Sequence, residues 1–94
     1  MTDNIADDII SMRREKLLRR VRNNPANVRF SDLCRLAEYF GFRHRGGKGS
    51  HRVYSHPGMG EILTFQDADG AAKAYQVRQL LDLLEKHGHR IGEH

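Results

Sequence analysis

Residues 42–66, FRHRGGKGSHRVYSHPGMGEILTFQ, decide the fold, because here the side-chain pattern changes to the period of two that is typical of β-strands. Two segments rich in turn-forming residues, Gly46–Gly49 and Pro57–Gly60, interrupt the pattern. We therefore predict a small antiparallel meander. Its three strands are expected over residues 42–45, 50–56 and 61–66.

Amphipathic helices are predicted on both sides of this meander. The helix before it has Ser31 as its expected N-cap and Gly41 as its stop. The helix after it follows a turn over 67–70, covers residues 74–87 and stops at Gly88. Apolar residues recur at helical spacing in both: Leu33, Leu36, Ala37 and Phe40 in the first, Val77, Leu80, Leu81 and Leu84 in the second. The flanking apolar residues expected to plug the first helix into the core are Val28, Phe30 and Phe42.

A further helix is predicted from Ile5 to about Arg22, ended by the segment 23–27. Its apolar stripe is thin, so we expect this helix either to pack loosely or to serve a partner. The stripe consists of Ile5, Ile9, Met12, Leu17 and Val21.

The order of elements predicts an α+β fold. It matches the α-β-β-β-α arrangement of double-stranded-RNA-binding domains, in which two helices cover one face of a three-stranded antiparallel sheet. The additional helix precedes that arrangement. We divide the chain into a helical extension and linker over 1–27, the α-β-β-β-α domain over 28–88 and a disordered tail over 89–94.

Composition excludes several classes of protein. The chain has 94 residues, enough for one small domain, and no apolar stretch approaches the ~20 residues of a membrane span. A single cysteine, Cys34, cannot form an internal disulfide, and no secretory segment follows Met1. We therefore expect a cytoplasmic protein without membrane contact, in which Cys34 is a small buried residue and not a nucleophile.

The net charge of +4 is concentrated in two blocks. Arg13–Arg22 holds six basic residues against one acid, and Arg43–Arg52 holds four basic residues and two histidines against none. Two basic blocks on a small domain indicate a polyanionic partner, most often a nucleic acid.

The second block contains the sharpest local motif, Gly47-Lys48-Gly49-Ser50-His51. Glycines allow close backbone approach to a ligand, Lys48 and Arg52 offer charge for phosphate, and histidine titrates near neutrality. Walker spacing is absent, so this is not a P-loop. The histidines at 44, 51 and 56 lack the spacing and the accompanying ligands of a metal site, so no metal or other cofactor is expected.

Three parts of the sequence resemble the HicA family of bacterial toxins. They are Phe30–Leu33 with Phe40–Phe42, Gly47–Pro57, and Lys73–Leu81. HicA proteins are small ribonucleases with a double-stranded-RNA-binding-like fold, held inactive by a HicB antitoxin. The resemblance implies that messenger RNA and a HicB-like antitoxin are the partners, that His51 is catalytic, and that Gly49 and Ser50 position it.

The chemistry of RNA agrees with that implication. RNA carries its own nucleophile, the 2′-hydroxyl, so cleavage needs a group that moves protons near pH 7 and cations that stabilise the phosphorane. His51 suits the first role, as acid or base, and the second suits Lys48, Arg52 and Arg45. The proline and histidine that many relatives carry after the third strand are replaced here by residues 66–70. Candidates for a second proton-transfer group are therefore His56, His44 and Lys73.

Two other functions remain open at the level of sequence. One is a non-catalytic RNA-binding module of the same fold. The other is an adaptor in which the first helix docks an acidic protein partner; that helix could equally extend the RNA surface or mediate self-association.

The orientation of His51 depends on which face of its strand is buried. If Val53 faces the core, His51 shares its side; if Tyr54 does, His51, Val53 and Ser55 face solvent. A solvent-facing catalytic histidine favours the second arrangement. We then expect Tyr54 and Tyr75 to pack in the core or between helix and sheet and not to serve as base-stacking platforms.

Overall fold

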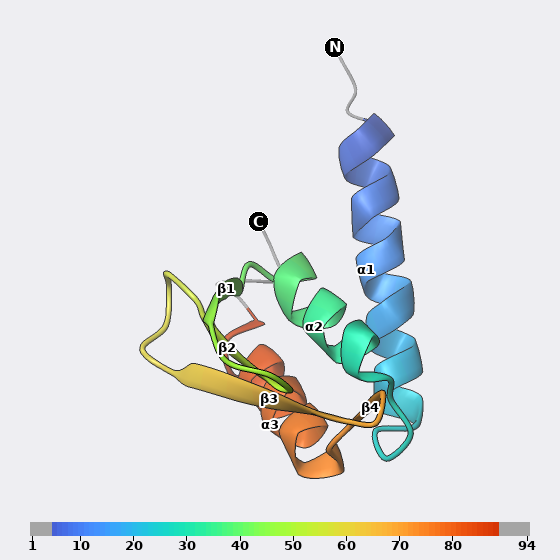
Figure 1. Ribbon diagram of the computed structural model, residues 1–94. Coiled ribbons are helices and arrows are strands. Elements are labelled where there is room, and N and C mark those ends of the chain that lie inside the picture. Colours follow the sequence, from blue (N-terminus) through green and yellow to red (C-terminus); the bar gives the residue numbers. More distant parts are fainter. Residues whose placement is uncertain (1–4, 89–94) are drawn as a thin grey trace.

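The computed structural model describes residues 5–88, which form three helices and four strands (Figure 1). The predicted α+β class, with its additional N-terminal helix, is confirmed. The predicted tail over 89–94 lies outside the described residues. In chain order the elements are α1 (Ile5–Asn23), α2 (Phe30–Tyr39), β1 (Arg43–Gly46), β2 (His51–Ser55), β3 (Ile62–Ala68), β4 (Ala71–Ala72) and α3 (Ala74–Lys86).

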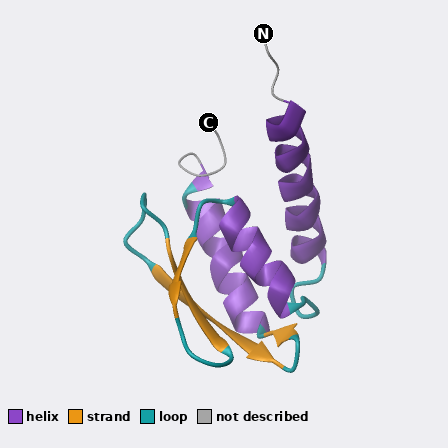
Figure 2. Ribbon diagram, turned by 45° about the horizontal axis from the view of Figure 1, so that its top comes forward, coloured by secondary structure: helices purple, strands orange, loops and turns teal. Residues whose placement is uncertain are grey.

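The strands form one antiparallel sheet in the order β1-β2-β3-β4, and α2 and α3 both lie against the same side of it (Figure 2). Tyr54, Leu63 and Phe65 point from the strands into this helix-covered side and are at most 1% exposed. Their strand neighbours point the other way. That opposite side, here called the outer face, carries His51, Val53, Ser55, Ile62, Thr64 and Gln66 from β2 and β3.

The C-terminus of α2 ends as its sequence predicts. Gly41 adopts a φ of +93°, in the left-handed region that favours glycine. Its N–H donates to the carbonyl of Glu38 and that of Phe42 donates to the carbonyl of Ala37, at 3.1 and 3.0 Å. These two bonds form a Schellman motif, which turns the chain directly into β1.

The predicted N-cap of α2 at Ser31 is wrong. Arg29 is the N-cap, with extended backbone and no side-chain cap, and its carbonyl accepts the N–H groups of Asp32 and Leu33. Arg29 also bridges to Ala71, while the N–H of Phe30 donates to the carbonyl of Gly70 at 2.9 Å. Pairing with a distant segment therefore sets the start of the helix.

The same segment differs from the predicted turn over 67–70, because it contains the end of one strand and leads into another. β3 continues to Ala68, the reversal is made by Asp69 and Gly70 with φ of 55° and 90°, and β4 pairs back onto β3. The N–H of Ala72 donates to the carbonyl of Val28, so β4 also fixes the segment before α2. A strand of two residues is too short to produce a recognisable pattern in the sequence.

The apolar stripe of α1 is buried only in its C-terminal half. There Leu17, Val21 and the unpredicted Leu18 pack into the core and are 2–7% exposed. Ile9 and Met12, 43% and 70% exposed, lie where α1 extends past the rest of the domain (Figure 1). The side chain of Ile5 lies outside those that the structure describes.

The remaining core predictions hold with two changes. Val28, Phe30 and Phe42 are buried as expected, and so is Cys34. In α3, Leu83 is buried and Leu81 only partly so. Tyr75 was expected to pack in the core or between helix and sheet, but the residue is 64% exposed.

Candidate functional site

The orientation of β2 places His51 on the outer face. Tyr54 is fully buried and its hydroxyl donates to Glu38 at 2.7 Å, so the arrangement with His51, Val53 and Ser55 directed outwards is the correct one. His51 is exposed, opens β2 and lies opposite Gln66 of β3. The imidazole is therefore accessible to a ligand on the side of the sheet that α2 and α3 leave uncovered.

The glycine-rich loop is held against the backbone of His51. The N–H of His51 donates to the carbonyl of Lys48 at 3.0 Å, and the carbonyl of Ser50 accepts the N–H of Asp67 at 2.8 Å. Gly47 has a φ of +129°, and a Cβ there would overlap the carbonyl of His51. The loop thus requires glycine at 47, and it brings Lys48, Gly49 and Ser50 together with His51.

Arg52 does not join this group. It lies opposite Phe65 and so belongs to the helix-covered side, with its guanidinium 5.7 Å from the ring centre of Phe30. A hydrogen bond with the Tyr54 hydroxyl raises the pKa of Arg52. Strand alternation therefore separates Arg52 from His51, although the two are adjacent in sequence.

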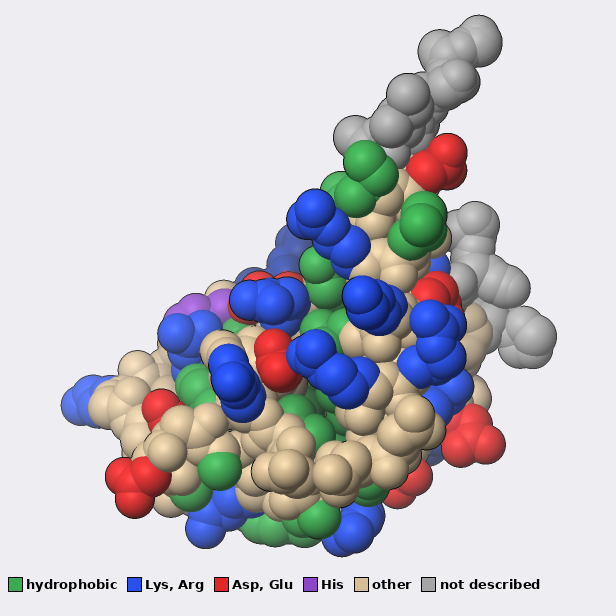
Figure 3. Space-filling view, turned by 90° about the vertical axis from the view of Figure 1, so that its right-hand side faces the viewer, with side chains coloured by type: hydrophobic (Ala, Val, Ile, Leu, Met, Phe, Trp, Pro, Cys, Tyr) green, Lys and Arg blue, Asp and Glu red, His purple; other side chains and the backbone are tan. Residues whose placement is uncertain are grey.

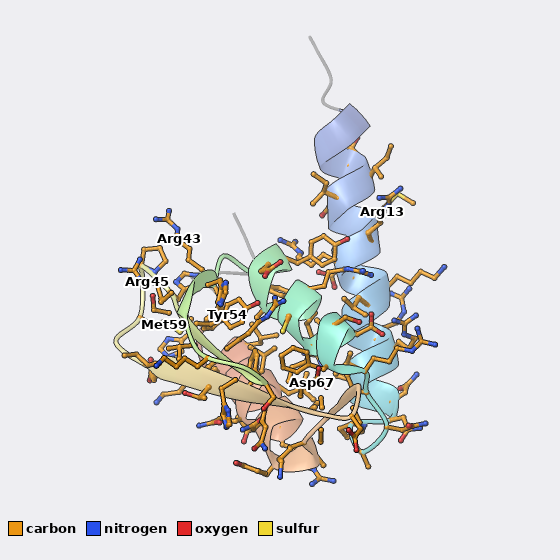
Figure 4. The ribbon with its side chains drawn as sticks, in the orientation of Figure 1. Arg13, Arg43, Arg45, Tyr54, Met59 and Asp67 are labelled. Carbon is orange, nitrogen blue, oxygen red and sulfur yellow. The ribbon has the colours of Figure 1, made fainter. Side chains whose placement is uncertain are left out.

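Strand β1 supplies further cations at the far end of the sheet. Arg43 lies opposite Ser55 and therefore on the outer face. It was not among the candidate site residues predicted from sequence, because only the strand register places it on this face. Arg45 occupies the irregular position between His44 and Gly46. Both side chains project from β1 on the side remote from α1 (Figure 4).

His56 uses both ring nitrogens within the fold. Its Nδ1 accepts the N–H of Gly58 at 2.9 Å, so the proton is on Nε2, which donates to the carbonyl of Phe40 at 3.0 Å. The ring also packs edge-on against Phe42, with centroids 5.0 Å apart. This histidine therefore holds the C-terminus of α2 to the turn after β2.

The other two candidates for a second proton-transfer group differ in position. His44 lies opposite Tyr54 on the helix-covered side, stacks on its ring at 5.4 Å and donates from Nε2 to the carbonyl of Gly46. Lys73 follows Ala72, the partner of Asp67, and so lies beside Gln66 at the His51 end of the sheet. Of the three, Lys73 is the one that the fold places at that end.

The family model for the HicA toxin of bacterial toxin-antitoxin systems matches residues 30–88, more than half of the chain. The chain belongs to the HicA toxin family. It is accordingly the toxin of a toxin–antitoxin system. Comparisons with curated proteins and with solved structures gave no significant match.

The HicA match runs from the first residue of α2 past the end of α3, and α1 precedes it. Lysine and arginine side chains gather over α1 and α2 (Figure 3). Between these helices lies a groove of about 510 Å³, lined by Arg13, Lys16, Leu17, Arg20, Arg35 and Tyr39. Asp32 offsets part of this charge, because Arg20 and Arg35 approach its carboxylate at 2.8 and 3.7 Å. The first basic block therefore forms a surface of its own, separate from His51.

Cys34 in this HicA domain has no exposed thiol. The residue is 4% exposed, and burial raises the pKa of its thiol. A protonated, inaccessible thiol is a poor nucleophile. Among residues 5–88, no helix has the length and hydropathy that crossing a membrane requires.

Proposed function

We propose that this toxin is an RNA endonuclease of the mRNA interferase type that cleaves without a metal ion and uses His51 for proton transfer. The observation that carries the proposal is the exposed His51 on the uncovered face, with its backbone held by the loop that bears Lys48. Because messenger RNA is the proposed substrate, we propose that the toxin acts in the cytoplasm.

The reaction is an internal displacement at phosphorus. The 2′-hydroxyl loses its proton and attacks the adjacent phosphate, and the bond to the 5′-oxygen of the next nucleotide breaks as that oxygen gains a proton. His51 moves one of these two protons, and Lys73 is the candidate for the other. Lys48 stabilises the additional negative charge of the phosphorane, aided by the backbone of Gly49 and Ser50. The products are a 2′,3′-cyclic phosphate and a free 5′-hydroxyl.

The test is cleavage of RNA by the purified protein in the presence of EDTA, with identification of the product ends. We expect cyclic phosphate ends from the wild-type protein and a loss of at least 100-fold in rate for His51→Ala. The matched control is His44→Ala, an exposed histidine on the opposite side of the same sheet, which should cleave at the wild-type rate. RNA binding without cleavage by the wild-type protein would favour the non-catalytic RNA-binding module instead.

We also propose that α1 contributes to docking of a HicB-like antitoxin. Ile9, Ile10 and Met12 are three of the five exposed large hydrophobic residues in the described chain, and all lie on the part of α1 that extends past the domain. Basic residues follow them along α1 from Arg13 onwards, so an acidic protein with an apolar groove is the partner that complements this surface. Met12→Asp should weaken the complex with the antitoxin at least tenfold. An unchanged affinity, or a loss of toxin self-association in place of antitoxin binding, would contradict the proposal.

A further inference from the structure

Tyr75 is a large aromatic residue that the fold leaves in solvent. It is the second residue of α3 and is 64% exposed. Burial in the core or between helix and sheet therefore does not account for an aromatic ring at this position.

The exposed ring is nevertheless held in place. The Nε2 of Gln76 donates to the Tyr75 hydroxyl at 3.2 Å, and the Oε1 of Gln76 accepts the backbone N–H of Gln66 at 2.8 Å. Gln76 itself is 5% exposed, so its amide is fixed by the surrounding structure. Because Gln66 lies opposite His51, two hydrogen bonds connect the Tyr75 ring to the cross-strand partner of the candidate catalytic histidine.

The surroundings of the ring are cationic. Lys73 precedes α3 as its N-cap, and Arg78 lies three residues after Tyr75 on the same side of the helix. The first turn of α3 contains no acidic residue. The nearby carboxylate of Asp67 accepts the N–H of Gly70 and thereby remains within its own turn.

We propose that Tyr75 forms a nucleobase-stacking subsite, which holds an unpaired base of single-stranded RNA beside the phosphate at His51. A fixed and exposed aromatic ring flanked by cations has the chemistry that binds single-stranded nucleic acid, where bases stack on the ring and cations contact the backbone. A base within a duplex is already stacked, so the subsite selects unpaired RNA. The position of the scissile phosphate in this inference rests on the proposed ribonuclease function.

The test measures binding of a fluorescent single-stranded RNA oligonucleotide to the His51→Ala variant, so that cleavage does not interfere. Adding Tyr75→Ala should raise Kd about tenfold, whereas Tyr75→Phe, which retains the stacking ring and loses only its bond to Gln76, should raise Kd by less than about threefold. Ile62→Ala is the matched control, since Ile62 is also 64% exposed and lies at the other end of the outer face. A duplex of the same sequence should bind equally with and without Tyr75→Ala.

Three results would overturn the inference: an unchanged Kd for Tyr75→Ala, an equal effect on the duplex, or no RNA binding by the parent variant. Thermal unfolding identifies a folding defect, which is not expected from truncating an exposed ring. Tyr75-dependent binding by a wild-type protein that does not cleave RNA would overturn the proposed ribonuclease activity and leave the stacking subsite standing.

Discussion

The hydroxyl of Tyr54 donates a hydrogen bond of 2.7 Å to the carboxylate of Glu38 and so connects the buried side of β2 to the outward side of α2. Tyr54 is fully buried, and this bond orients its ring, whose centre lies 5.4 Å from that of Phe65. Because successive residues of a strand point to opposite sides, burial of Tyr54 is what directs His51 to solvent.

Alkaline pH is expected to destabilise the protein through Tyr54. Burial, followed by the bond to Glu38, raises the pKa of Tyr54 above its ordinary value. The unfolded chain releases this proton at about pH 10, whereas the folded protein retains it, so the stabilising contribution is complete below about pH 10 and is lost as the pH rises further. Urea unfolding at pH 8 to 11 should show a steeper loss of unfolding free energy for the wild type than for Tyr54→Phe. Equal slopes would contradict this assignment.

Substitution of Gly47 is expected to damage both the loop and the site. Gly47→Ala places a side chain at a φ of +129° and against the backbone of His51, which should cost about 1–3 kcal/mol of unfolding free energy and reduce RNA cleavage. The control is Gly60→Ala, because a Cβ at Gly60 meets nothing within 4 Å. Urea denaturation and a cleavage assay measure both effects. Wild-type stability and activity in Gly47→Ala would show that the loop does not constrain His51.

His56 is expected to act on stability and not on catalysis. His56→Ala leaves the carbonyl of Phe40 and the N–H of Gly58 without these bonds, which should lower the unfolding free energy by about 2 kcal/mol. The rate of RNA cleavage per folded molecule should stay close to that of the wild type. Normal stability together with lost cleavage would instead indicate that His56 is the second proton-transfer group.

The two halves of α1 are expected to respond differently to truncation. Leu17→Ala removes a core side chain that is 6% exposed and should cost about 2–3 kcal/mol. Met12→Ala, at a position 70% exposed, should change the unfolding free energy by less than about 0.5 kcal/mol. Urea denaturation of each variant, in the absence of antitoxin, measures the two changes in unfolding free energy. A large loss for Met12→Ala would mean that the projecting half of α1 packs against the domain in solution.

Local chemistry in the sequence was sufficient for the described helices and strands other than β4, and for the identity of the candidate catalytic residue. Apolar spacing identified α2 and α3, alternation identified the strands, and Gly41 marked the end of α2, because each of these signals depends on neighbours within a turn or two. The Gly-Lys-Gly-Ser-His run identified His51 on the same local grounds and through the family resemblance.

Tertiary structure alone decided which residues meet. Alternation predicts that His51 and Arg52 point to opposite sides, but burial of Tyr54 beneath the helices determines which of them lies on the outer face. Likewise, pairing with the segment at β4 starts α2 at Phe30, and the bond to the carbonyl of Phe40 engages His56. These contacts join segments that are separated in the chain, so no local pattern records them. The sequence by itself determined the helices, the three longer strands and the candidate histidine. Long-range packing determined β4, the face of the sheet on which His51 lies, the neighbours of His51 and the exposure of the Tyr75 ring.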